Sequence, residues 1–274
     1  MRTDVNLIHR VEVTAVSRLT PGMIRIEFGG EGLDGFVFSG VGDEYLRLFL
    51  PPTGHDEPNL PEPAADDYWR FPEGVEPAVA RTYTVRAWEP GRLTIDFVVH
   101  DGGIAATWAL GARPGHIAGV NTPRPLYAAP DDITWQLLVA DATGLPAALR
   151  LAEQAPDHVQ TRVVLEVLAP EHRQDVVPRS NVEVLWTYGG TVTALAKSKR
   201  SSAVPNCRGA KATCGWLGNQ EHARSPQIPA PRPASALLRF QSRGLLDEGR
   251  GEVGRALRGL ARGRARAARD DVGR

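Results

Sequence analysis

Residues 81–86, RTYTVR, and the stretch DFVVHDGGIAATWA at 96–109 decide how this sequence folds. Every second residue of a strand shares a face, so one face of the first stretch carries Arg81, Tyr83 and Val85. A strand that only supports a core rarely places a guanidinium beside an aromatic ring. A site for a flat, negatively charged ligand needs both, so this stretch predicts a strand that also binds.

Short candidate strands with turn signals between them surround this motif. Alternating apolar residues predict two strands around a Pro-Gly turn within 11–30, and a further strand at 44–51. Residues 52–79 are rich in Pro, Asp and Glu and predict a long exposed loop. The run 81–98 predicts a hairpin around a Glu-Pro-Gly turn. Strands spaced in this way favour an antiparallel β-barrel.

The pattern changes after residue 100. Residues 102–113 are Ala-rich and led by two glycines, which predicts a short helix. An apolar strand, a polar turn and an amphipathic helix follow within 135–156, and 161–170 and 181–188 are further apolar strands. Apolar strands alternating with helices predict a parallel sheet.

Composition restricts the class of protein. The 274 residues are 42% hydrophobic and 23% charged, which is enough apolar sequence for a packed core. No apolar run approaches the roughly 20 residues of a membrane span, and the N-terminus lacks a signal-peptide core. The two cysteines are too few for a disulfide framework and do not have zinc-ligand spacing. We therefore expect a cytoplasmic protein with no membrane insertion and no metal.

The residue types in 81–103 match the requirements of a flavin nucleotide. Arg81 offers a planar cation to a diphosphate, and Tyr83 offers a ring face to the isoalloxazine. Thr84 could reach the ring edge with its hydroxyl or its N–H, and Gly102-Gly103 would let a phosphate approach free N–H groups at a helix start. The alternative is a half-buried hairpin with one salt bridge and a glycine-capped helix.

The stretch VADATGLPAAL, residues 139–149, is the second chemical signal. A strand that runs through Asp and small residues into a helix is a common dinucleotide site, although the usual glycine spacing is missing here. Alternatively, Asp141 and Thr143 only cap the helix. No Ser-His-Asp arrangement or histidine ligand spacing is present, so no catalytic acid, base or metal ligand is predicted.

The sequence therefore predicts an α+β protein of two domains followed by a tail. Residues 1–128 form the antiparallel β-barrel, and residues 129–191 form the first half of an α/β domain of the NAD(P)-binding type with a parallel sheet. Residues 192–274 are an atypical basic tail that we expect to be irregular and poorly ordered.

The order of these motifs resembles the siderophore-interacting protein family. RTYTVR, DFVVHDGGIAATWA, ARPGHIAGV and LLVADATGLPAALRLAEQAP occur in the family's order over about residues 8–190. Members of that family are FAD-containing ferric-siderophore reductases on a ferredoxin–NADP reductase-like scaffold. Three positions depart from its pattern, because Tyr45 replaces a histidine, His116 an aspartate and Gly144 an alanine.

The resemblance implies roles for individual residues. The FAD-binding strand would be Arg81, Thr82, Tyr83 and Thr84. The pyrophosphate and adenine side would be lined by His100, Ala105, Ala106, Thr107 and Trp108. The place where NAD(P)H approaches would be formed by Asp141, Thr143, Leu145 and Pro146.

The resemblance also implies a reaction. NAD(P)H or another reductant would reduce FAD, and single electrons would pass to iron(III) held by a siderophore, which would release iron(II). The partner would be a ferric siderophore. Independently of the resemblance, we expect a monomer. Two alternatives stay open: a flavoprotein reductase with a different acceptor, and a non-catalytic siderophore-binding module.

The tail departs from the family pattern. Residues 191–274 hold 17 Lys or Arg against 6 Asp or Glu, within a chain of zero net charge. Aromatics for base stacking are nearly absent, so we expect no nucleic-acid partner. Three segments, GAKATC, RSPQIPAPRPA and GLLDEG, can be encoded so that shifted frames read like the missing family segments. We therefore expect a frameshifted tail and impaired reduction, which the coding DNA and an activity assay would test.

Overall fold

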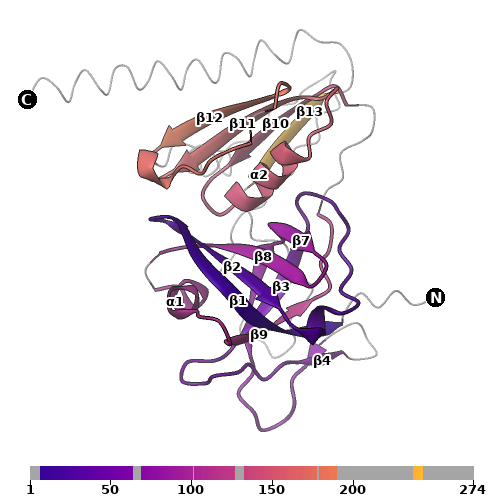
Figure 1. Cartoon of the computed structure of the whole chain (residues 1–274), viewed down its shortest axis with the longest axis vertical. Helices are drawn as coiled ribbons and strands as arrows, with labels where there is room; N and C mark the ends of the chain where they lie inside the picture. Colours follow the sequence, from indigo (N-terminus) through magenta and orange to yellow (C-terminus); the bar gives the residue numbers. More distant parts are fainter. Residues whose placement is uncertain are drawn as a thin grey trace, which may run out of the picture.

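The computed structural model describes residues 7–63, 69–100, 102–126, 133–177, 179–189 and 237–242. Its two larger sheets lie one above the other along the long axis of the molecule (Figure 1). The first is antiparallel, and the second is mainly parallel with one nine-residue helix beside it. This arrangement confirms the predicted α+β fold class.

The first sheet contains seven strands in the order β6-β3-β9-β1-β2-β8-β7. Its inner face is apolar because alternate residues of each strand point inward, and Val13, Ile26, Leu48, Ile95 and Phe97 are completely buried. The strands are β1 (Ile8–Thr20), β2 (Met23–Gly29), β3 (Tyr45–Leu50), β6 (Val79–Thr84), β7 (Ala87–Glu89), β8 (Arg92–Val98) and β9 (Ile117–Asn121). The two strands expected within 11–30 and the strand expected at 44–51 are thereby confirmed.

The hairpin expected over 81–98 is only half correct. β7 and β8 form it through a turn between Glu89 and Arg92, but β6 pairs with β3 at the opposite edge of the sheet. The strand breaks after Thr84 because the next two backbone N–H groups bond in different directions. Val85 donates to the Glu44 carbonyl at 3.1 Å, and Arg86 donates to the Thr94 carbonyl at 3.0 Å.

This break brings the two ends of the sheet together. Glu44 precedes β3 on one side, and Thr94 lies in β8 on the other. We call Val85 and Arg86 the seam, because their backbone links both sides and closes the sheet into the predicted barrel.

The segment 52–79 contains more structure than the predicted exposed loop. It forms the two-residue strands β4 (Glu62–Pro63) and β5 (Trp69–Arg70). The Trp69 ring packs edge-on against Phe49, with 5.3 Å between ring centroids. The segment therefore covers part of the outer face of β3. The short 3-10 turn η1 (Glu31–Leu33) packs beside β1.

The second sheet follows the expected strand–helix–strand pattern. β10 (Trp135–Ala140) pairs in parallel with β11 (Gln160–Val167), which pairs in parallel with β12 (Val182–Tyr188). Helix α2 (Leu145–Glu153) follows β10, and a second 3-10 turn, η2 (Pro170–His172), follows β11. A fourth strand, β13 (Leu237–Ser242), runs antiparallel to β10.

Helix α2 lies between the second sheet and the barrel (Figure 1). Its apolar side joins Leu138, Val163 and Leu165 in a second core, which also takes in Met23 from the barrel. The two domains therefore share packed side chains. The shorter α1 (Ile104–Gly111) packs on the barrel itself.

Some expectations lie outside the described residues. The boundary between 128 and 129 falls in 127–132, and most of the tail, 190–236 and 243–274, is likewise not described. None of the helices in the described part is long and apolar enough to cross a membrane.

Candidate functional site

Strand β6 carries the predicted binding residues at an edge of the first sheet. Tyr83 stands opposite Leu46 and Arg81 opposite Leu48, so the two side chains share a face as the alternation predicted. Thr82 and Thr84 occupy the other face. Arg81 is exposed, and its guanidinium donates only to the neighbouring Ala80 carbonyl at 2.8 Å among the groups that the structure describes. This cation is available to an anion.

An aromatic row joins β6 to α1. The Tyr83 ring lies 4.5 Å from Phe97, and Phe97 lies 6.0 Å from Trp108, measured between ring centroids. Trp108 is stacked on Phe28 at 6.3 Å. Burial raises the pKa of the Tyr83 phenol above its ordinary value, although nearby Arg81 opposes the shift. Tyr83 therefore stays a neutral ring at physiological pH.

Helix α1 begins beside a hollow. Gly102 has a φ of +78°, a value that side-chain-bearing residues rarely adopt, and Gly103 caps the helix without a side chain. The first N–H groups of α1 therefore have no side-chain cap, which suits a phosphate. The hollow measures about 310 Å³ and is lined by Pro51, Pro52, Thr53, Gly54, His55, Gly102, Ile104, Thr107 and Trp108.

The other residues predicted on this side are placed differently. Ala105 and Ala106 are both buried, and Ala105 packs in the barrel core, so neither side chain lines the hollow. His100 is exposed, and its imidazole stands against Gly103, where an added Cβ would lie 2.3 Å from Cε1. Their contact with a cofactor stays a prediction.

Arg47 is a residue that the sequence analysis missed. It lies in β3 opposite Thr82, is 9% exposed, and its Nε has no hydrogen-bond partner. Burial, together with the nearby Arg81 cation, lowers its pKa to about 10. No ion pair joins it to a carboxylate among the described residues. A buried cation without an anion is costly and marks a place that suits a negatively charged group.

The predicted NAD(P)H-side residues occupy the turn between β10 and α2. The Asp141 carboxylate accepts hydrogen bonds from the N–H and hydroxyl of Thr143 at 2.9 and 2.6 Å, and from the Gly144 N–H at 3.2 Å. Leu145 and Pro146 are buried in the helix. The turn lies at the carboxyl end of β10, where dinucleotides bind in such sheets. Direct contact with NAD(P)H stays a prediction.

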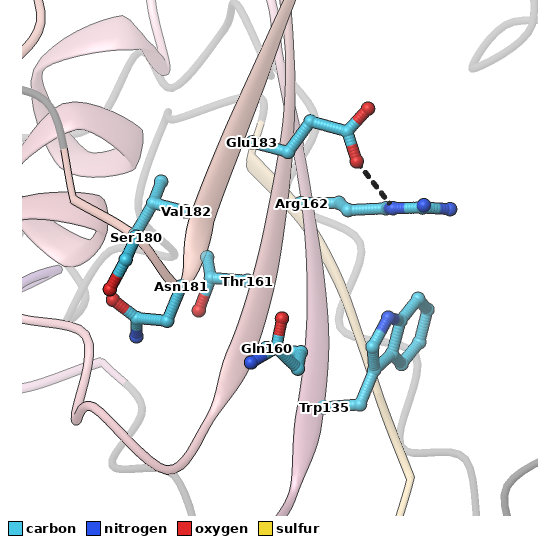
Figure 2. A pocket seen from close by; sticks show the side chains of 8 residues that line it. All are labelled: Trp135, Gln160, Thr161, Arg162, Ser180, Asn181, Val182 and Glu183. Atoms are coloured by element: carbon cyan, nitrogen blue, oxygen red, sulfur yellow. Dashed lines mark ion pairs between the residues drawn. The ribbon is translucent and has the colours of Figure 1, made fainter.

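A second hollow lies at the opposite end of the parallel strands. It measures about 220 Å³ and contains a 2.8 Å ion pair between Arg162 and Glu183 (Figure 2). Its lining residues are Trp135, Gln160, Thr161, Arg162, Ser180, Asn181, Val182 and Glu183. Because ligands of these sheets bind at the carboxyl ends of the strands, we do not assign it a cofactor.

Comparison with known proteins places the chain in a family. Residues 12–126 match the family domain described as "Siderophore-interacting FAD-binding domain", and residues 133–223 match "Siderophore-interacting protein". The chain belongs to the siderophore-interacting protein family. The second match runs past residue 191, so it includes part of the tail that we expected to depart from the family pattern.

Individual proteins of other organisms are also similar to this chain. An uncharacterized protein of Mycobacterium tuberculosis is 32% identical over 219 residues, covering 78% of this chain and 77% of its own length. The NADPH-dependent ferric-chelate reductase of Escherichia coli is 38% identical over 155 residues, covering 56% of this chain and 59% of the enzyme.

Solved structures also resemble the chain. A siderophore utilization protein from T. fusca has a TM-score of 0.61 at 29% identity, covering 74% of this chain and 78% of that one. A ferredoxin reductase of carbazole 1,9a-dioxygenase has a TM-score of 0.50 at 14% identity. The match covers 70% of this chain and 57% of that one. The second likeness concerns the fold alone and agrees with the predicted scaffold.

Proposed function

We propose that this chain binds FAD along β6 and α1 and delivers electrons to ferric siderophores. The observation that carries the proposal is the pair of cations at β3 and β6. Arg47 is buried with an unpartnered Nε, and Arg81 is exposed beside it without a described acidic partner. A diphosphate would supply the missing anion.

The remaining residues also fit the cofactor. The face of Tyr83 suits a flat ring, and the capless start of α1 suits phosphate oxygens. Thr84 ends β6 with a hydroxyl and an N–H at the edge where the ring would lie. When bound, FAD would accept electrons from a reductant such as NAD(P)H and pass them singly to iron(III). The names of the E. coli reductase and of the ferric vibriobactin reductase of Vibrio cholerae support this acceptor.

The first test is cofactor binding. We expect the purified full chain to retain or take up FAD, seen as absorbance near about 450 nm. We expect Arg81→Ala to weaken FAD binding about tenfold, since a charge-assisted hydrogen bond is lost. Arg92→Ala, an exposed arginine of β8 paired with Glu89, is the matched control and should bind FAD normally. Unchanged flavin retention in Arg81→Ala would contradict the phosphate role.

The second test concerns the acceptor. The FAD-loaded chain should release iron(II) from a ferric siderophore into a chelator when NADPH or NADH is supplied. Bound flavin without iron(II) release would favour a reductase with another acceptor. A chain that binds siderophore but takes up no FAD would favour a non-catalytic binding module.

A further inference from the structure

The seam of the barrel is held by a helix of the other domain. Arg150 of α2 reaches out of the second sheet's core, and its Nη1 donates to the Val85 carbonyl at 2.5 Å. Its Nη2 donates to the Glu44 carboxylate at 2.7 Å. Because Val85 also bonds to the Glu44 backbone, these three residues form a closed ring of hydrogen bonds.

This ring is buried. Arg150 is 4% exposed, and Glu44 is completely buried. The second carboxylate oxygen of Glu44 accepts bonds from the N–H and hydroxyl of Ser39, both at 2.7 Å. The carboxylate is therefore satisfied on both oxygens, and its geometry is fixed by the groups around it.

The next turn of α2 also holds the seam, through Glu153. Glu153 lies three residues after Arg150 and so faces the same way. It accepts two hydrogen bonds from the Arg86 guanidinium, at 2.9 and 2.6 Å. Thus consecutive residues of the seam, Val85 and Arg86, are held by two side chains of one helix face.

We propose that Arg150, which belongs to the second domain, is a positioning residue. It holds the end of β6 in the barrel in the geometry that the flavin needs. The inference rests on the proposed function, because it assumes that FAD lies along Tyr83 and Thr84. The Val85 carbonyl that Arg150 holds follows Thr84 directly, so a shift there would move the backbone at the ring edge. A buried ion pair seldom adds net stability over an apolar pair of similar volume, so stability alone does not explain it.

The same helix begins at the Asp141 turn, where the reductant is expected to approach. One rigid element thus connects the nucleotide side to the flavin strand, from Gly144 at its start to Glu153 at its end. Arg150 joins this helix to the barrel, because its guanidinium bonds to two acceptors there.

The test separates positioning from folding with three variants of the full chain. Arg150→Met leaves Glu44 as a lone buried charge and should lower the melting temperature. Glu44→Leu combined with Arg150→Met removes both charges and should recover much of the lost melting temperature. Leu149→Ala cuts a cavity in the second core next to Arg150 and is the control for lost stability alone.

The readouts are the FAD dissociation constant, the visible spectrum of the bound flavin and its midpoint potential. We expect both variants that carry Arg150→Met to bind FAD about tenfold more weakly and to shift the flavin spectrum and midpoint potential. Leu149→Ala should leave the spectrum and the midpoint potential unchanged. The proposal is overturned if the double variant regains wild-type flavin properties together with its stability, or if Leu149→Ala shifts them equally. If the wild-type chain takes up no FAD, the proposed function fails instead, before any variant is compared.

Discussion

At the scale of single residues, Arg47 lowers the stability of the folded chain and at the same time offers a cation for a bound phosphate. Its guanidinium is buried beside another cation, and its lowered pKa means that the unfolded chain binds the proton more tightly than the folded chain. The cost to stability is therefore fully present below pH 10 and declines only as the pH rises above about 10. A bound phosphate would offset it at physiological pH.

This leads to effects of opposite sign for Arg47→Met. We expect the apoprotein to gain up to about 3 kcal/mol of unfolding free energy, since the desolvated charge is removed. We expect FAD affinity to fall about tenfold or more, since the phosphate loses a cation. Denaturant titration and flavin fluorescence measure the two quantities. Arg162→Met, which removes half of an exposed ion pair, should change neither noticeably. A loss of apoprotein stability in Arg47→Met would contradict the argument.

At the scale of elements, two glycines should respond oppositely to the same substitution. A Cβ on Gly32 of η1 would lie 1.8 Å from the Arg10 carbonyl oxygen, which is backbone of β1 and cannot move aside. We expect Gly32→Ala to cost about 3 kcal/mol or more by separating η1 from β1.

Gly111, at the end of α1, has open space around its Cα. Gly111→Ala should stabilise the chain by about 0.5–1 kcal/mol, because alanine loses less backbone entropy in a helix. Thermal unfolding of both variants beside the wild type measures the difference. Equal effects in the two variants would show that the packing of η1 on β1 does not decide the result.

The element scale also shows what the sequence could reveal. Alternating apolar residues were sufficient to predict β1, β2 and β3, and continuous apolar runs were sufficient to predict the strands of the second sheet. It could not reveal that β6 pairs with β3, since strand partners depend on contacts distant in sequence. Arg47 was missed because it is a single charge within the otherwise apolar run LRLFL, and Arg150 because a buried arginine on a helix looks like a surface one.

At the scale of the whole molecule, we expect the tail to limit the proposed electron transfer rather than cofactor binding. The barrel and its cation pair lie within residues 7–126, so FAD binding should not depend on residues beyond 190. We expect the full chain to bind FAD normally but to reduce ferric siderophore more slowly than the E. coli ferric-chelate reductase assayed in parallel. Iron(II) capture per bound flavin is the measurement. A rate equal to that of the E. coli enzyme would contradict an impaired tail.

The seam also affects how the protein can be divided. The two family matches meet between residues 126 and 133, which suggests an obvious place to cut the gene. A fragment ending there would lose the arginine that pairs with Glu44, and would deprive Arg86 of its partner on α2. The boundary between the two family matches is therefore not a boundary at which the folded protein can be divided without losing contacts. Excision of the N-terminal module would be tolerated only if α2 were carried along or the orphaned carboxylate were replaced.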